Sequence, residues 1–208
     1  MEYISRNRGI RWRKCGFFFF LLALLSFSVL GQEKRPLIRE KGFIIGIGQG
    51  IDSSNVPEGY YNPIFFIGHI GLDVSKRRAW QNPSTGIFTL YLEPQINPVW
   101  IKGKDRTDKA IEFGVNVGFK HMFRLLPKLY TFISIGVGPH FTSVHTSKQR
   151  RGFLFSDNLG TGLYYYIFKD WAIQFTFRLR HLSNGDTMKP NMGINTFNYH
   201  IGISKVLK

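Results

Sequence analysis

The chain has 208 residues and a formal net charge of +15 at pH 7, because its 28 lysines and arginines outnumber its 13 aspartates and glutamates. Such an excess of basic residues predicts an anionic partner. The single cysteine, Cys15, excludes a disulfide within the chain. The sequence also lacks the glycine motifs of nucleotide-binding proteins, a CxxC pair and the HExxH zinc motif, which argues against those classes of enzyme.

Residues 1–31 have the pattern of a cleaved signal peptide. A basic segment is followed by an apolar run over residues 17–30 and then by the small residue Gly31. The apolar run is short for a transmembrane helix, which needs about 20 residues, so an uncleaved anchor is the less favoured alternative. We therefore expect residues 32–208 to form a single exported domain.

An exported chain rarely meets nucleic acid, whereas a protein in the bacterial outer membrane is surrounded by the phosphates of the glycolipid in its outer leaflet. We therefore expect the anionic partner to be a lipid phosphate and not a nucleic acid. A merely solvated basic surface is the simpler alternative for most of the lysines.

Apolar residues recur at every second position after Gly31, which predicts β-strands, and no stretch has a convincing 3.6-residue period. In residues 110–120, for example, apolar side chains alternate with polar ones and glycines. Eight segments follow this pattern, and we expect strands at residues 41–51, 64–74, 86–98, 110–120, 129–140, 152–165, 170–183 and 195–207.

Eight strands of about ten residues, each with one apolar face, are typical of the smallest outer-membrane proteins. We therefore predict an eight-stranded antiparallel transmembrane β-barrel, whose closure leaves no unpaired strand edge in the lipid. A barrel of this size has an interior filled by side chains. The inward positions should therefore hold a buried ion-pair network and no pore; its predicted members are Glu93, Glu112, Lys120, Arg178 and Arg180.

The lengths of the connections predict which end of the barrel lies outside the cell. In this class of barrel the extracellular loops are long and the periplasmic turns short. We expect long polar loops at residues 52–63, 99–109, 142–151 and 184–194, and short turns at 121–128 and 166–169. Both termini would then lie in the periplasm. Residues 76–84 do not fit, because they form a connection too long for a periplasmic turn.

The strand at residues 170–183 carries a general base and a nucleophile at its end. Residues two apart on a strand share a face at about 6.6 Å, so His181 and Ser183 follow the apolar, outward row of that strand. Asn195 has the same parity at the start of the final strand. A serine hydroxyl needs a base to take its proton, and the base needs a third group that holds its tautomer. His181, Ser183 and Asn195 are therefore the predicted catalytic residues.

The loop between these strands contains Asn184, Gly185 and Asn191, which could donate hydrogen bonds to a developing oxyanion. A structural alternative stays open, since a His-x-Ser pair at the rim of a barrel could simply lie among lipid headgroups as interfacial polar residues.

The motifs His181-x-Ser183-Asn184 and Pro190-Asn191-x-Gly193, followed by the final strand, resemble the signature of the outer-membrane lipid A 3-O-deacylases, the PagL family. The resemblance covers residues 181–208. It implies an eight-stranded barrel whose Ser-His-acid site, on the outer wall, hydrolyses the ester-linked acyl chain at position 3 of lipid A.

The same resemblance implies roles for individual residues. Ser183 would be the nucleophile, His181 the base and Asn191 an oxyanion-hole side chain, with a backbone N–H near Gly185 or Asp186 as the second donor. The chain departs from the family at the acid, because Asn195 occupies the position of the family's glutamate. An amide can orient an imidazole but cannot neutralise imidazolium, and replacing aspartate by asparagine in a serine triad costs about 10⁴ in rate through the wrong tautomer. Asp186 could substitute for the missing acid.

The leading hypothesis is therefore an outer-membrane serine esterase that deacylates lipid A in the leaflet around it. Acyl chains would pack on apolar residues of the last two strands, Phe175, Phe177, Phe197 and Tyr199, and Lys189 could bind the phosphates. No cofactor is implied. No metal site is implied either, because the six histidines lack ligand spacing.

Two alternatives come from other classes of protein. A non-catalytic barrel with an envelope or interaction role would explain Asn195, and a soluble lipid-binding barrel of the lipocalin type would require an apolar interior. The acyl position, the chain length, activity on phospholipids and a possible homodimer are left open by the sequence.

Overall fold

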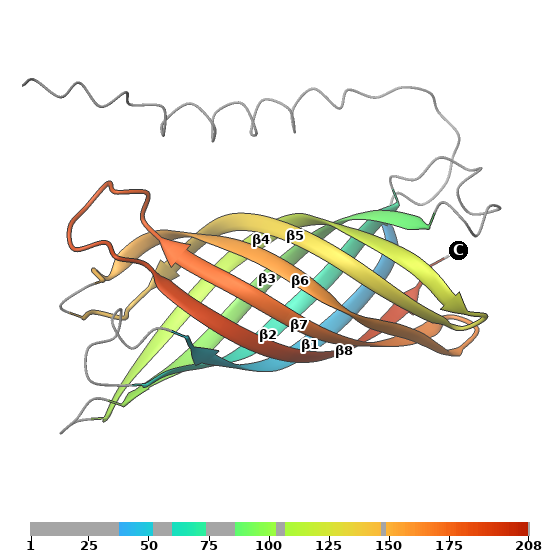
Figure 1. Cartoon of the computed structure of the whole chain (residues 1–208), viewed down its shortest axis with the longest axis horizontal. Helices are drawn as coiled ribbons and strands as arrows, with labels where there is room; N and C mark the ends of the chain where they lie inside the picture. Colours follow the sequence, from blue (N-terminus) through green and yellow to red (C-terminus); the bar gives the residue numbers. More distant parts are fainter. Residues whose placement is uncertain (1–37, 52–59, 74–85, 103–106, 147–148, 208) are drawn as a thin grey trace, which may run out of the picture. The chain divides into compact units, whose positions relative to one another are not determined.

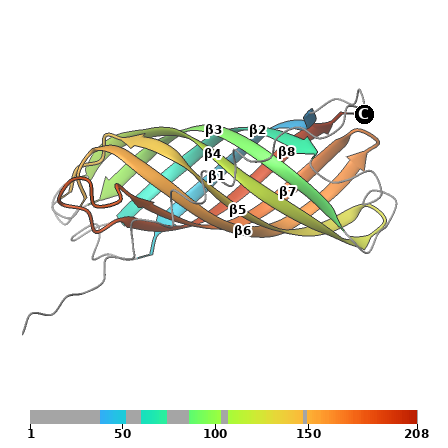
Figure 2. The same cartoon turned by 90° about the horizontal axis from the view of Figure 1, so that it is seen from above.

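The computed structural model describes residues 38–51, 60–73, 86–102, 107–146 and 149–207. Over these ranges the chain forms eight antiparallel strands that pair in chain order and close into a barrel, with β1 hydrogen-bonded to β8 (Figures 1 and 2). The strands are β1 (Ile38–Gly50), β2 (Tyr60–Asp73), β3 (Ile87–Lys102), β4 (Thr107–Leu126), β5 (Leu129–Thr142), β6 (Gly152–Phe168), β7 (Trp171–Ser183) and β8 (Ile194–Val206).

The predicted eight-stranded antiparallel barrel is confirmed, and each of the eight predicted segments lies on a strand. The predicted leader at residues 1–31 and the connection at 76–84 lie outside the described residues. Among the described residues, none belongs to a helix that is long and apolar enough to cross a membrane.

Several predicted connections overlap the strands: β2 already begins at Tyr60 and β6 continues to Phe168, and two predicted connections are largely wrong. Residues 99–102 and 107–109 belong to β3 and β4, where Trp100 pairs with Lys109, and residues 121–126 continue β4 to a turn at 127–128. The reason is that a membrane strand needs only about 9–11 residues in the lipid, whereas the 20 residues of β4 continue the ladder beyond it. Polar residues at these strand ends resembled loops in the sequence.

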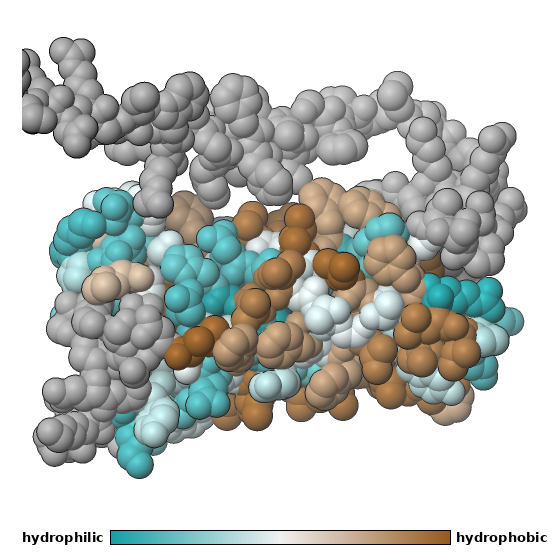
Figure 3. All heavy atoms as spheres, viewed as in Figure 1, coloured by the Kyte–Doolittle hydropathy of each residue, from teal (hydrophilic) through white to brown (hydrophobic). Residues whose placement is uncertain are grey.

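Alternate residues of each strand face opposite sides of the barrel wall. On β7, Trp171, Ile173 and Phe175 are 38–54% exposed, while Ala172, Gln174 and Thr176 between them are at most 5% exposed. Figure 3 shows apolar side chains over much of the wall on one face of the barrel. The outward row of each strand is therefore the lipid-facing one.

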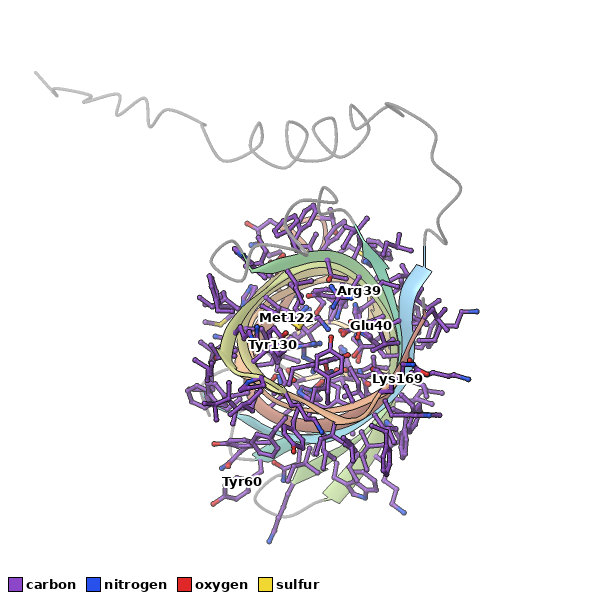
Figure 4. The ribbon with its side chains drawn as sticks, turned by 90° about the vertical axis from the view of Figure 1, so that its right-hand side faces the viewer. Arg39, Glu40, Tyr60, Met122, Tyr130 and Lys169 are labelled. Carbon is purple, nitrogen blue, oxygen red and sulfur yellow. The ribbon has the colours of Figure 1, made fainter. Side chains whose placement is uncertain are left out.

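The interior holds a buried network of charged side chains. Lys120 contacts Glu40 at 2.6 Å, His69 bridges Glu40 and Glu93 at 3.1 and 3.0 Å, and Arg178 contacts Glu93 at 2.9 Å. A separate pair joins Arg180 to Glu112 at 2.9 Å. Figure 4, a view along the barrel, shows Glu40 inside the ring of strands and Tyr60 outside it.

The predicted ion-pair network of the interior is thus confirmed, and Glu40 and His69 extend it. An interior of paired charges does not suit the lipocalin-type alternative, whose ligand requires apolar walls.

Replacing Arg178 with methionine is expected to lower the free energy of unfolding by about 3–5 kcal/mol, because the buried Glu93 carboxylate loses its guanidinium partner and keeps, among the described residues, only the contact with His69. Urea unfolding of the barrel in detergent measures this change. Arg124→Met is the matched control, since Arg124 is exposed and its loss should cost only about 0.5 kcal/mol. Equal stability of the two variants would show that the network does not stabilise the fold.

Candidate active site

His181 and Ser183 end β7, and Asn195 lies near the start of β8 directly opposite His181 in the strand register. All three side chains are half-buried, whereas Arg180 and Leu182 between them are at most 3% exposed and belong to the interior. The alternation therefore turns the three polar side chains outward, in the row that also carries Phe175.

His181 and Asn195 make a short hydrogen bond. The distance between His181 Nδ1 and Asn195 Oδ1 is 2.6 Å. An amide oxygen only accepts, so Nδ1 must carry the ring proton and Nε2 is left as the free base. An asparagine that accepts in this way holds the tautomer that a general base needs, although it supplies no negative charge.

Ser183 lies two residues from His181 on the same face, opposite Phe155 of β6. Within the described part of the chain its hydroxyl makes no hydrogen bond, so it is not engaged elsewhere. Catalytic hydrogen bonds are often loose without substrate and tighten in the bound complex. The Ser183 hydroxyl is thus available to a base on the neighbouring outward position.

The loop at residues 184–193 is folded onto itself by asparagine contacts. The Asn184 backbone N–H donates to Asn191 Oδ1 at 2.9 Å, and Asn184 Nδ2 donates to the Met188 carbonyl at 2.7 Å. Gly185 and Asp186 both have positive φ, at 61° and 65°, which makes the tight turn after Ser183. The structure thus brings Asn184 and Asn191 together, beside the end of β7.

Asp186, the predicted substitute acid, contacts residues of its own loop. Its carboxylate is 2.7 Å from Lys189 Nζ and 3.3 Å from Asn191 Nδ2. Asp186 and Lys189 are both largely exposed, at 67% and 74% for their side chains. The part of Asp186 as the acid therefore stays a prediction, and Lys189 is oriented by Asp186.

Gln149, from the loop between β5 and β6, fixes this loop from the side and was missed by the sequence reasoning. Its side chain is fully buried, its Oε1 accepts the Gly193 N–H at 3.1 Å, and its backbone forms a bridge with Asn191. The Arg150 N–H donates to the Pro190 carbonyl at 3.1 Å. No sequence signal could have found Gln149, because a glutamine in a polar loop carries no motif.

Gly193 lies against the imidazole. Its φ is +78°, and a Cβ built there would be 2.5 Å from His181 Cε1, closer than side chains tolerate. Only glycine therefore fits this position while the ring keeps its place. In the described ranges, no three His, Cys, Asp or Glu side chains are grouped to hold a metal ion.

Residues 66–204 match the family described as lipid A 3-O-deacylase (PagL). The match spans well over half of the chain and includes the whole segment from His181 to Asn195. The chain belongs to the PagL family.

Solved structures agree on the fold of this PagL-family chain. It is similar to the outer membrane enzyme PagL, with a TM-score of 0.53 and 19% identity, over 78% of this chain and 97% of that one. It is also similar to Neisserial surface protein A (NspA), with a TM-score of 0.56 and 10% identity, over 81% and 96% of the two chains. A comparison with curated proteins found no significant match.

Family membership places this chain among outer-membrane barrels and hydrolases of the lipid A deacylase class. The resemblance inferred from residues 181–208 is confirmed and extends over most of the barrel.

Proposed function

We propose that this PagL-family barrel is a serine esterase that removes the ester-linked acyl chain at position 3 of lipid A. One observation supports this above all: an outward-facing His181, oriented by Asn195 at 2.6 Å, lies two residues from Ser183. All the side chains involved come from one chain, so the reaction requires no second copy.

The first half of the reaction transfers the acyl group to the protein. Nε2 of His181 takes the Ser183 proton as the hydroxyl oxygen attacks the ester carbonyl. The tetrahedral oxyanion accepts hydrogen bonds from the Asn191 side chain and from a backbone N–H near Gly185 or Asp186. The C–O bond to the sugar breaks, and His181 returns the proton to the departing sugar hydroxyl.

The second half regenerates the enzyme. A water molecule gives a proton to His181 and attacks the acyl-serine carbonyl, which releases the fatty acid and restores the Ser183 hydroxyl. His181 acts as base and then as acid in each half, so no cofactor is consumed.

An outward site suits a substrate held in the same leaflet. Below the site, Phe177 stacks on Phe197 with ring centroids 5.5 Å apart and contacts the tilted ring of Tyr199 at 5.4 Å, and Phe175 is 54% exposed. These rings offer the acyl chain an apolar surface that continues into the bilayer. In this proposal the exposed side chain of Lys189, in the loop beyond Ser183, binds the lipid A phosphates.

Cells whose lipid A carries the 3-O-linked acyl chain should lose it when they produce the wild-type protein and keep it when they produce Ser183→Ala. Mass spectrometry of extracted lipid A measures the missing chain. Ser143→Ala is the control, since Ser143 is an exposed serine after β5 and its loss should leave deacylation intact. Unchanged lipid A with the wild type would reject the activity.

Asn195 favours a second candidate, a PagL-family barrel that has lost catalysis and serves as an envelope or interaction protein. This candidate requires that neither the wild-type protein nor Ser183→Ala deacylates lipid A, and that Asn195→Glu creates the activity. Deacylation by the wild type eliminates it.

A further inference from the structure

A serine triad asks two things of its acid: to hold the tautomer of the histidine and to offset the positive charge of the imidazolium. Asn195 can do only the first. We propose that Asp157 of β6 is a positioning residue that offsets the positive charge of the imidazolium, while Asn195 holds the tautomer of His181. This inference rests on the proposed esterase function.

The register of the barrel places Asp157 beside His181. In the β6–β7 pair Asp157 lies directly opposite His181, and in the β7–β8 pair Asn195 lies opposite it on the other flank. Facing side chains on antiparallel strands have Cβ atoms about 4.5–5.5 Å apart. His181 is therefore held between a carboxylate and an amide.

Asp157 faces outward, like His181. The side chains before and after it, Ser156 and Asn158, are at most 8% exposed and point into the barrel, whereas Asp157 is exposed. Its carboxylate is close enough to the His181 ring for an electrostatic interaction. Among the described residues, no lysine, arginine or histidine nitrogen lies within ion-pair distance of Asp157, so its carboxylate is not held in an ion pair and acts on the facing His181 ring through space.

A carboxylate is unexpected in the outward, lipid-facing row of β6. The neighbouring outward residues of β6, Phe155 and Leu159, are apolar, with Leu159 52% exposed, and β5 faces Asp157 with Val137. An ionisable side chain on the apolar wall of a barrel is costly, and such residues are usually functional. Asp157, His181 and Asn195 thus form a continuous polar band across three strands.

The proton transfer gives this band a role. When Nε2 of His181 takes the Ser183 proton, Asn195 Oδ1 still accepts the Nδ1 hydrogen while the ring becomes positive. The Asp157 carboxylate offsets that charge, and the attraction is stronger beside lipid than in water. The adjoining loops carry further charged groups, Arg150 and Arg151 before β6 and Asp186 and Lys189 after β7.

The test compares purified wild type, Asp157→Asn and Ser183→Ala in detergent, on lipid A with the 3-O-linked chain. Asp157→Asn keeps the shape and removes the charge. We expect kcat to fall roughly 10-fold to 100-fold with little change in KM. The acidic limb of the rate profile should move to lower pH, because the ring holds its proton less readily without the carboxylate. Asp170→Asn, in the turn at the far end of β6, should change neither.

A rescue variant distinguishes charge from packing. In the Asp157→Asn background, Asn195→Glu places a carboxylate on the other flank and should restore most of kcat. Asn195→Glu alone should raise kcat only a few-fold, since the charge is already present. Asp157→Ser repeats the test with a smaller side chain if Asp157→Asn does not assemble.

A second readout does not depend on turnover. The imidazole nitrogens of His181, followed by NMR in micelles, should titrate at lower pH in Asp157→Asn than in the wild type. If Asp157→Asn keeps the kcat, the pH profile and the His181 titration of the wild type while Ser183→Ala is inactive, the proposed role of Asp157 is wrong and the proposed esterase function still stands. If the wild type is inactive, the proposed esterase function is wrong. If His181 then also titrates at the same pH in the wild type and in Asp157→Asn, the proposed coupling of Asp157 to His181 is wrong as well.

Discussion

Replacing His181 with alanine is expected to lower kcat for lipid A deacylation on the order of 10³-fold or more, and replacing both His181 and Ser183 should cost no more than either change alone. The reason is that the imidazole acts only through the serine hydroxyl. Without the base the hydroxyl stays protonated, and without the hydroxyl the base has no proton to take. Single-turnover rates of the two single variants and the double variant measure this non-additivity.

His121→Ala is the matched control for this series. His121 lies on the outer wall near the C-terminal end of β4, at the end of the barrel opposite the candidate site, and packs against Phe123 with ring centroids 4.3 Å apart. Its loss should leave kcat unchanged. Additive losses in the double variant would mean that His181 and Ser183 act independently, and the esterase mechanism proposed here would then be wrong.

The fold could be predicted from the sequence because the two-residue apolar period persists along every strand. The ends of the strands could not, as at β3 and β4, because residues beyond the bilayer need no apolar face and still pair in the ladder. Trp100 and Lys109 show this, since they pair across a stretch that looked like a polar loop. Strand pairing outside the lipid is set by hydrogen bonding, which leaves little trace in composition.

The candidate site could likewise be predicted only in part from the sequence. Parity alone placed His181, Ser183 and Asn195 on one face, and the 2.6 Å contact of His181 with Asn195 agrees with that placement. Asp157 was on a predicted strand, yet its position opposite His181 depends on the register between β6 and β7. Register follows from turn geometry and packing and not from one strand's pattern. Gln149 depends on a contact between two loops, which periodicity cannot describe.

Gly193→Ala is expected to lower kcat roughly 100-fold or more while the barrel still assembles. The new Cβ would lie 2.5 Å from His181 Cε1 and 3.1 Å from Nε2, so the ring must turn away from its position or the loop must shift. Either movement separates the base from Ser183, and small misplacements of a catalytic group carry losses of this size. Deacylation rates, measured beside unfolding by urea, separate this effect from a loss of stability.

Gly152→Ala is the matched control for this change. Gly152 also has a positive φ, +123°, but a Cβ there would meet only Met188 Cε at 3.9 Å. Both substitutions strain the backbone and should destabilise the barrel by about 1 kcal/mol or more, so stability should fall in both while activity falls only in Gly193→Ala. Full activity of Gly193→Ala would show that the imidazole does not need the place in which the loop holds it, and the positions of Gly193 and Gln149 would then be structural alone.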